Sequence, residues 1–292
     1  MKLYHYTAVT LGESILSSAI SNGHLIHSDN SMSQGVVWLT TEPRPGGHGL
    51  TRGDEILDAS QRAHQLRAQG GVARNHVTLD KTQLRITVEL DPEQDPRLMS
   101  FMQYCKVYES KRFAKVYGLS CLVDVKRLAP KELMRLMKSA STKESTWWLS
   151  FNPVRPEAFV SVDFNVKGKF EPYDFERHGR EAMRRYGFAL PSPKALAEIA
   201  DIVPAAHRLE RPKAFVFCDD PDKPPKVAVR GGATVRAFDL RTRDLVVGEA
   251  DDRTAPLQAW VDRHSDELEA CWTEAVDLFY TFYPDRRAVA PA

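Results

Sequence analysis

The chain has 292 residues, of which 42% are hydrophobic and 27% are charged, a composition typical of a globular protein with one or two domains. Its 40 basic and 39 acidic residues nearly cancel, which argues against a strongly basic nucleic-acid-binding protein. Two segments, 106–115 and 126–143, are nevertheless rich in Lys and Arg. We interpret them as solvated helix faces, with a local basic surface as the alternative.

Membrane, secretory and zinc-binding proteins are not indicated either. No apolar run approaches the roughly 18 residues of a membrane helix, and Met1 and Lys2 lead directly into a strand without a signal peptide. The four cysteines lie far apart, so we expect reduced thiols in a cytoplasmic protein without structural zinc. His24 and His27 lack a third ligand, so no metal site is predicted.

The first predicted element is a strand over residues 3–7, Leu-Tyr-His-Tyr-Thr. Its alternation places His5 and Thr7 on one face and Tyr6 on the other. Thr10 starts a predicted helix with the spacing of a capping box, and a glycine at position 23 marks where this helix stops. An apolar strand follows and ends in Trp-Leu-Thr-Thr at residues 38–41.

The middle of the chain alternates predicted helices with predicted strands. In chain order these are a Gly-rich loop at 42–49, a helix at 54–66, a strand at 84–90, a helix at 98–118, a short strand at 121–125, a helix from Pro130 and a strand at 158–164. The helix from Pro130 has four apolar residues on one face, which predicts a core position. Trp147 and Trp148 are adjacent, so we expect one to pack inside and the other to cover a pocket or a partner.

The C-terminal part changes character. Residues 171–207 are punctuated by Pro and Gly and are interpreted as a linker with some structure of its own. Residues 208–292 predict a small α+β domain, with strands at 212–218, 226–229, 233–240 and 244–247 before an amphipathic helix at 262–279. We expect this domain to be a small antiparallel sheet packed by one long helix.

The pattern of residues 3–41 resembles the start of bacterial NAD-dependent ADP-ribosyltransferases: a His-Tyr-Thr strand, a helix, a glycine and an apolar strand ending in Leu-Thr-Thr. The nearest groups are the diphtheria-toxin/poly-ADP-ribose-polymerase type, the DNA-modifying toxin type and the RNA 2'-phosphotransferase type. The resemblance covers roughly residues 1–170. It implies an α+β fold with a mixed, split sheet and flanking helices that form an NAD-binding domain.

The C-terminal domain resembles a small uncharacterised family found fused to, or encoded beside, toxin–antitoxin proteins. The likeness rests on the Pro-Pro-x-Val-x-Val strand at 224–229 and on the later helix that contains Trp272. Two positions that hold histidines in that family hold Lys226 and Ala228 here. The resemblance therefore implies a partner-binding or regulatory role for residues 208–292, and no histidine-dependent one.

The first resemblance implies displacement of nicotinamide from NAD through an oxocarbenium-like ribose. Such a site needs a group that orients the ribose, a wall for the nicotinamide ring and a carboxylate. His5 is the candidate donor to a ribose hydroxyl, with Thr7 assisting on the same face and Tyr6 beside it. Trp38 is the candidate wall, with a core position as its alternative, and Thr40 is a candidate polar contact.

The catalytic carboxylate of this family lies near the start of a late strand. This position implies Glu157, at the head of Glu-Ala-Phe-Val-Ser-Val, as a catalytic residue together with His5. Asp163, at the far end of the same strand, is the second candidate, and Glu109 is the third. A solvated glutamate after a proline is the alternative interpretation of Glu157.

The sequence therefore predicts an NAD-dependent ADP-ribosyltransferase, a bacterial toxin or phage-defence effector, with NAD as its substrate. The acceptor is expected to be nucleic acid or protein, and the C-terminal domain is expected to bind an antitoxin or another partner, without a membrane. The first alternative is a catalytically inactive sensor or immunity module that binds NAD or ADP-ribose. An NAD-dependent RNA 2'-phosphate-removing enzyme ranks last, because residues 1–60 show no matching arginine pattern.

Overall fold

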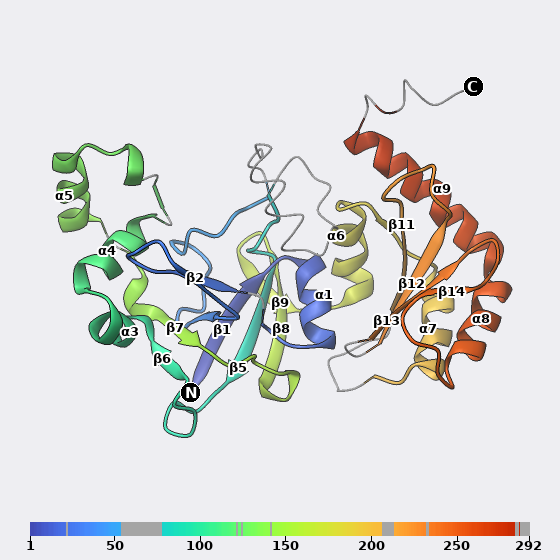
Figure 1. Cartoon of the computed structure of the whole chain (residues 1–292), viewed down its shortest axis with the longest axis horizontal. Coiled ribbons are helices and arrows are strands. Elements are labelled where there is room, and N and C mark those ends of the chain that lie inside the picture. Colours follow the sequence, from blue (N-terminus) through green and yellow to red (C-terminus); the bar gives the residue numbers. More distant parts are fainter. Residues whose placement is uncertain are drawn as a thin grey trace. The chain divides into compact units, whose positions relative to one another are not determined.

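The computed structural model describes residues 1–21, 23–53, 78–120, 122–123, 125–140, 142–205, 213–231, 234–283 and 286. The helix expected over 54–66 lies outside these residues. The described chain is an α+β protein with a seven-stranded, a five-stranded and a two-stranded antiparallel sheet (Figure 1). It divides into two compact units. Unit 1 holds Met1–Ala8, Ala19–Glu55 and Thr78–Tyr173, and unit 2 holds Val9–Ser18 and the chain from Asp174 onward.

Unit 1 is built mainly from strands, with helices inserted between β6 and β7. Its elements are β1 (Lys2–Thr7), β2 (His24–Ile26), β3 (Met32–Gln34), β4 (Val37–Thr40), β5 (Leu84–Glu89), β6 (Leu98–Ser100), α3 (Phe101–Tyr108), α4 (Lys111–Ser120), the 3-10 turn η1 (Val125–Arg127), α5 (Pro130–Ser139), the 3-10 turn η2 (Glu144–Thr146), β7 (Trp147–Ser150), the 3-10 turn η3 (Pro156–Ala158), β8 (Phe159–Val166) and β9 (Lys169–Pro172).

The large sheet has the strand order β6-β7-β4-β1-β5-β8-β9, and every neighbouring pair is antiparallel. The prediction of a mixed sheet was therefore wrong. Strands β1 and β5 pair along their whole length, from Lys2↔Glu89 to Thr7↔Leu84. Strands β1 and β4 share a single pair, Tyr4↔Thr40, so the two halves of the sheet part beside β1.

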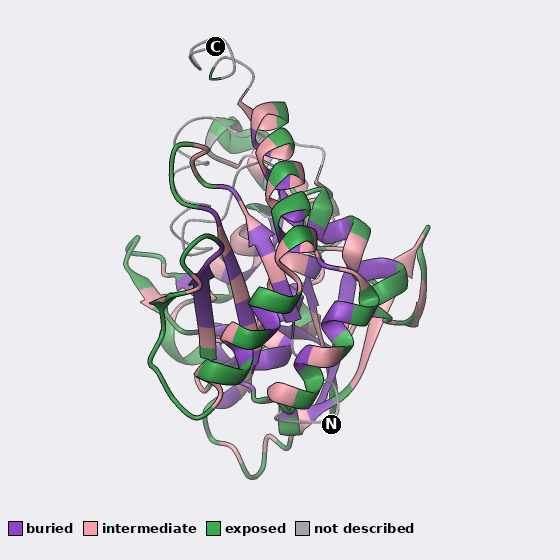
Figure 2. Cartoon of the chain, turned by 90° about the vertical axis from the view of Figure 1, so that its right-hand side faces the viewer, coloured by how far each residue is buried: buried purple, intermediate pink, exposed green. Residues whose placement is uncertain are grey.

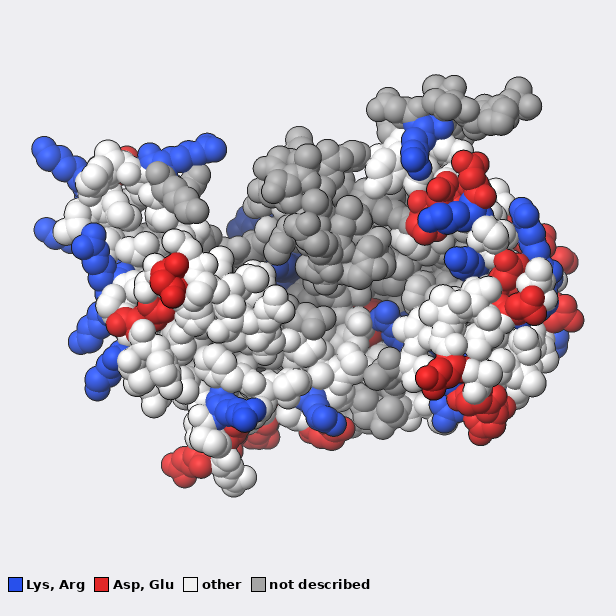
Figure 3. All heavy atoms as spheres, in the orientation of Figure 1, with Lys and Arg blue, Asp and Glu red and all other residues white. Residues whose placement is uncertain are grey.

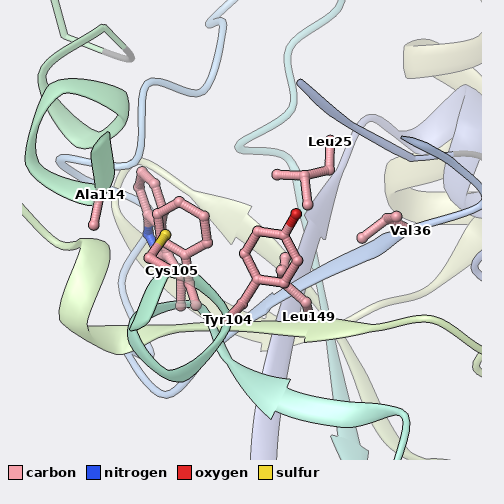
Figure 4. Packing of buried hydrophobic residues seen from close by; sticks show 8 residues of the cluster. Leu25, Val36, Tyr104, Cys105, Ala114 and Leu149 are labelled. Carbon is pink, nitrogen blue, oxygen red and sulfur yellow. The ribbon is translucent and has the colours of Figure 1, made fainter. Parts of the chain in front are cut away.

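The core of unit 1 confirms the predicted strand alternation. The inward residues of β5, Leu84, Ile86 and Val88, are fully buried. A second cluster joins the β4–β7 half of the sheet to α3 and α4, and Figure 4 shows Tyr104, Cys105 and Leu149 among its residues. Trp147 belongs to this cluster, while Trp148 is partly exposed, as expected for neighbours on opposite faces.

Two predicted helices of unit 1 differ from the structure. The helix expected over 98–118 is two helices, because the Ser110 hydroxyl accepts a hydrogen bond from the Phe113 N–H and starts a new helix there. α5 begins with Pro130 in its first turn, as predicted. It contains no buried residue, so its interpretation as a core helix was wrong.

The first helix, α1 (Val9–Ser17), belongs to unit 2. Thr10 lies inside this helix, and its buried hydroxyl has no hydrogen-bond partner in the described part of the chain, so the prediction that it caps the helix was wrong. The helix also ends well before Gly23. That glycine serves another purpose, because a Cβ there would lie 2.0 Å from the Val36 carbonyl oxygen.

Unit 2 is a five-stranded antiparallel sheet covered by helices, with the order β10-β11-β12-β13-β14. Figure 2 shows buried strands together with helices whose outer turns are exposed. The elements after α1 are the π-turn η4 (Phe175–Gly179), α6 (Arg180–Arg184), β10 (Phe188–Ala189), α7 (Pro193–Ile202), β11 (Lys213–Phe217), β12 (Lys226–Gly231), β13 (Thr234–Asp239), β14 (Leu245–Val247), α8 (Thr254–Arg263) and α9 (Ser265–Phe282).

The four predicted C-terminal strands and the long helix are present as β11–β14 and α9. Of residues 171–207, expected as a linker, 174–205 instead belong to unit 2, in which Phe175, Met183 and Ile199 are buried. Helix α7 contacts β11 and α8, α8 contacts α9, and α9 contacts β10 and β11, so more than one helix covers the sheet. Within the described residues, no helix combines the length and the apolar character needed to cross a bilayer.

Candidate active site

His5 lies on β1, where this strand and β4 part. Its Nδ1 is 3.0 Å from the Trp38 carbonyl oxygen, which can only accept, so Nδ1 carries the proton. Burial lowers the pKa of His5 to about 4, so the ring is neutral at pH 7 and Nε2 is a bare acceptor. His5 is therefore set to accept a hydrogen bond from a hydroxyl group, whereas the sequence suggested a donor.

Tyr6 and Thr7 follow His5 on the same strand. The Tyr6 hydroxyl donates to the Glu42 carbonyl at 3.0 Å, and burial raises its pKa. The Tyr6 ring lies 6.2 Å from the rings of His48 and Phe170. Thr7 is buried at the end of β1, on the same face as His5.

Thr40 and Thr146 join β4 to the turn before β7. The Thr146 hydroxyl donates to the Lys143 carbonyl at 2.7 Å, so the Thr40 hydroxyl must donate to Thr146 across 3.0 Å. Thr40 in turn accepts the Glu42 N–H at 3.1 Å. This chain of hydrogen bonds fixes turn η2 against the end of β4. Thr40 thus positions the turn, and through it the residue that the turn carries.

That residue is Glu144, at the start of η2. Its side chain is 11% exposed, and its Oε1 lies 3.5 Å from the Lys115 ammonium on α4. Its Oε2 is buried and has no hydrogen-bond partner among the described residues. Gly118, also on α4, leaves room for this oxygen, because a Cβ there would lie 2.9 Å from it. A buried carboxylate oxygen without a partner is costly, so it marks a candidate functional group.

His48 packs against the strand that follows Glu144. The Trp147 indole N–H donates to His48 Nδ1 at 2.7 Å, so in the neutral ring Nε2 carries the proton. Burial, with the nearby Lys143 charge, lowers the pKa of His48 to about 4. Its Nε2 is buried and makes no hydrogen bond of normal geometry within the described part of the chain. His48, in the Gly-rich loop after β4, is therefore half-buried.

Trp38 lies in an aromatic cluster. Its ring stacks on Tyr117 at 5.5 Å and meets the edge of Trp147 at 5.6 Å. Its indole N–H donates to the His24 carbonyl at 2.9 Å. Trp38 is thus partly buried and packs against the core cluster that contains Phe101 and Trp147. Its connection to the candidate site runs through the main-chain carbonyl that holds His5.

The three carboxylates suggested by the sequence lie elsewhere. Glu157 is exposed before β8, and β5 separates β8 from β1. Asp163 is ion-paired with Arg85 at 3.0 Å. Glu109 lies 3.3 Å from His27, at the β2–β3 hairpin. Each of these carboxylates is therefore either exposed or already paired with a basic side chain.

The sequence reasoning overlooked Glu144, although it applied a rule that also fits this residue. Glu144 precedes a late strand just as Glu157 does, and only the strand order distinguishes the two. β7 pairs with β4 from Val37↔Ser150 to Thr40↔Trp147, which brings η2 to the edge where β4 leaves β1. Two tryptophans directly after the turn were a signal in the sequence that this turn is anchored in a core.

The side chains on β1, β4 and η2 can do specific chemistry. A neutral histidine that accepts from a hydroxyl orients a sugar, and a carboxylate with an open oxygen stabilises positive charge or takes a proton. In the part of the chain that the structure describes, no group of three His, Cys, Asp or Glu residues could hold a metal ion.

Comparison of the chain with protein-family models, curated proteins and solved structures gave no match.

Proposed function

We propose that this protein is an NAD-dependent ADP-ribosyltransferase whose catalytic carboxylate is Glu144. The observation that carries the proposal is the buried Glu144 Oε2, which has no hydrogen-bond partner among the described residues, on the turn that the Thr40 hydroxyl fixes at the end of β4. The His5 acceptor on β1 supports it, because NAD presents ribose hydroxyls next to the nicotinamide. The bacterial toxin or phage-defence role, with unit 2 as the partner-binding or regulatory part, belongs to the same proposal.

In the proposed reaction, the bond between the ribose C1 and the nicotinamide nitrogen breaks, and nicotinamide leaves as a neutral molecule with the electron pair. A nucleophilic oxygen or nitrogen of the acceptor forms the new bond to C1, and its proton passes to Glu144 or to solvent. His5 orients the ribose by accepting from a hydroxyl. Glu144 opposes the positive charge that develops on the ribose.

The test compares the same substitution at two glutamates. We expect Glu144→Gln to lower the rate of nicotinamide release from NAD by about a hundredfold or more, because it removes a charge that acts on the transition state. Glu157→Gln is the matched control and should leave the rate unchanged, since that side chain is exposed before β8. Loss of release in Glu157→Gln with retention in Glu144→Gln would overturn the assignment.

The inactive sensor is the second candidate function, favoured by the ion pair that already occupies Glu144 Oε1. A sensor would bind NAD or ADP-ribose in calorimetry and release no nicotinamide, alone or with nucleic acid, protein or lysate added. If the protein neither binds NAD or ADP-ribose nor releases nicotinamide, both proposals are contradicted. Release that is lost in His5→Ala would support the enzyme and exclude the sensor.

A further inference from the structure

Charge is distributed unevenly along this chain. Residues 106–143 hold ten Lys or Arg and three Asp or Glu, a net charge of +7, whereas the whole chain carries +1. The rest of the protein is therefore acidic on balance. A local concentration of positive charge of this size favours an acidic partner.

The structure places these charges on one part of unit 1. Six exposed side chains on α3, α4 and α5 form what we name the basic surface: Lys106, Lys111, Arg112, Lys131, Arg135 and Lys138. Figure 3 shows Lys and Arg gathered along the left edge of the view, where Figure 1 places α4 and α5. Helix α4 contacts both α3 and α5, so the three helices form one continuous support.

Apolar side chains are exposed between these charges. Val107 and Tyr108, at the end of α3, are each 64% exposed, and Met134 on α5 is 48% exposed. A single-stranded nucleic acid presents both phosphates and unstacked bases, so it matches a surface of mixed basic and apolar side chains. A duplex hides its bases and offers less to the apolar part.

Helix α4 connects the basic surface to Glu144. Lys111 and Lys115 are four residues apart and share a face of the helix. Lys115 reaches Glu144 Oε1 at 3.5 Å, and Gly118 packs against Oε2. A nucleic-acid strand bound along α4 would therefore run toward the carboxylate of the proposed active site.

We propose that the basic surface binds single-stranded nucleic acid, and that this nucleic acid is the acceptor of the ADP-ribosyl group. The second half of the inference rests on the proposed function, whereas binding itself needs neither NAD nor turnover. In the transfer, a base or sugar atom of the strand supplies the nucleophile that replaces nicotinamide at the ribose C1.

The experiment measures fluorescence anisotropy of a labelled strand of about 20 nucleotides with the full chain and without NAD. The probes are single-stranded DNA, single-stranded RNA of the same sequence and the DNA duplex. The triple variant Lys111→Glu, Lys131→Glu and Arg135→Glu reverses three charges of the basic surface. Its control, Lys169→Glu, Lys194→Glu and Arg241→Glu, makes the same changes at exposed positions elsewhere.

We expect the first triple variant to raise the Kd for a single strand at least about tenfold, and the control to stay within about twofold. The slope of log K against the logarithm of the salt concentration should become shallower by about 2, because each lost phosphate contact reduces the size of this slope by about 0.7. Tighter binding of DNA than of RNA, or the reverse, would name the acceptor. Equal weakening by both triple variants would mean that net charge alone matters, and would overturn the inference.

Three other outcomes would overturn it as well: no binding of any strand, equal binding of the duplex, or binding only to vesicles of phosphatidylcholine and phosphatidylserine. Nicotinamide release without nucleic acid is measured separately and tests the proposed function alone. NAD turnover without strand binding would remove this inference and leave the enzyme. If the protein binds the nucleic acid but does not turn over NAD, the basic surface is supported as a binding site and the proposed transfer to the nucleic acid is contradicted.

Discussion

His5 and Glu144, the two residues of the proposed active site, have different surroundings. His5 is fixed by one main-chain carbonyl and kept neutral by burial, so one ring nitrogen is left to accept. Glu144 keeps one oxygen near Lys115 and the other without a partner in the described residues. Burying such groups lowers the free energy of unfolding, and this cost can be measured at the scale of a single residue.

The pH dependence of stability tests the state of His5. The pKa of His5 is lowered to about 4 in the folded chain, against 6.5 for a free histidine, so the unfolded chain binds the proton more tightly. The free energy of unfolding should therefore fall as the pH drops from about 6.5 toward 4. Between pH 7 and about 4.5 the His5 contribution should fall by about 2 kcal/mol.

Urea unfolding of the wild type and of His5→Gln at both pH values measures this contribution, because the variant lacks the titrating group. The wild type should lose more stability on acidification than the variant does. Identical losses in the two proteins would show that His5 is not buried in its neutral form.

At the scale of secondary-structure elements, helix α4 matters most, because residues on one of its faces surround Glu144. Lys115 and Gly118 are one turn apart, so a single helix supplies both the charge near one oxygen and the space around the other. Turn η2 and strand β4 supply the remaining support through Thr40 and Thr146. The carboxylate therefore depends on three elements far apart in the sequence.

Gly118→Ala tests the role of α4. An added Cβ would lie 2.9 Å from Glu144 Oε2 and 3.2 Å from the Thr142 Cβ, so the carboxylate must shift. Nicotinamide release should fall about tenfold or more, since small displacements of a catalytic group are costly. Alanine is favoured over glycine inside a helix by about 1 kcal/mol, which offsets the crowding, so Tm should change little.

Gly46→Ala, in the loop after β4, is the control for Gly118→Ala, because a Cβ at Gly46 would meet no atom within 4 Å. Its nicotinamide release should equal that of the wild type. A Gly118→Ala protein with full activity would show that Glu144 does not need its present position.

At the scale of the whole molecule, unit 2 combines the N-terminal helix α1 with the C-terminal part of the chain. Glu13 on α1 forms a buried ion pair with Lys213 on β11, two residues separated by 200 positions. The Lys213 ammonium also lies 4.6 Å from the centre of the Phe175 ring. Burial and the charge of Arg230 lower the pKa of Lys213, so its carboxylate partner is needed to keep it charged.

Removing one partner of this pair should therefore cost much more than removing both. We expect Glu13→Leu to lower the free energy of unfolding by about 3–5 kcal/mol, because it leaves Lys213 buried without its carboxylate partner. The double variant with Lys213→Met should recover most of this loss. Urea denaturation of the three proteins measures both values.

The exposed pair of Asp219 and Lys223 is the comparison, since Asp219→Asn should change stability by less than about 0.5 kcal/mol. Equal losses at Glu13 and Asp219 would contradict the burial of the first pair. A double variant as unstable as Glu13→Leu would show that Glu13 acts through other contacts.

The sequence by itself determined the elements whose pattern is local. The alternation of β1 and β5, the four strands β11–β14 and the long amphipathic helix α9 follow from the spacing of apolar residues within each segment. It also identified His5 and Thr40 as residues of interest, because both stand out within short strands. Periodicity is a property of neighbouring residues, so one segment is enough to show it.

Only the tertiary structure shows that turn η2, which carries Glu144, lies at the end of β4, and that α1 belongs to unit 2. Glu144 and Glu157 both precede a strand, and only the order β7-β4-β1-β5-β8 places one of them beside the parting of β4 from β1. Likewise, nothing within α1 indicates that Glu13 pairs with Lys213. Burial of a charged group depends on residues distant in the sequence, and strand pairing, rather than local spacing, brings those residues together.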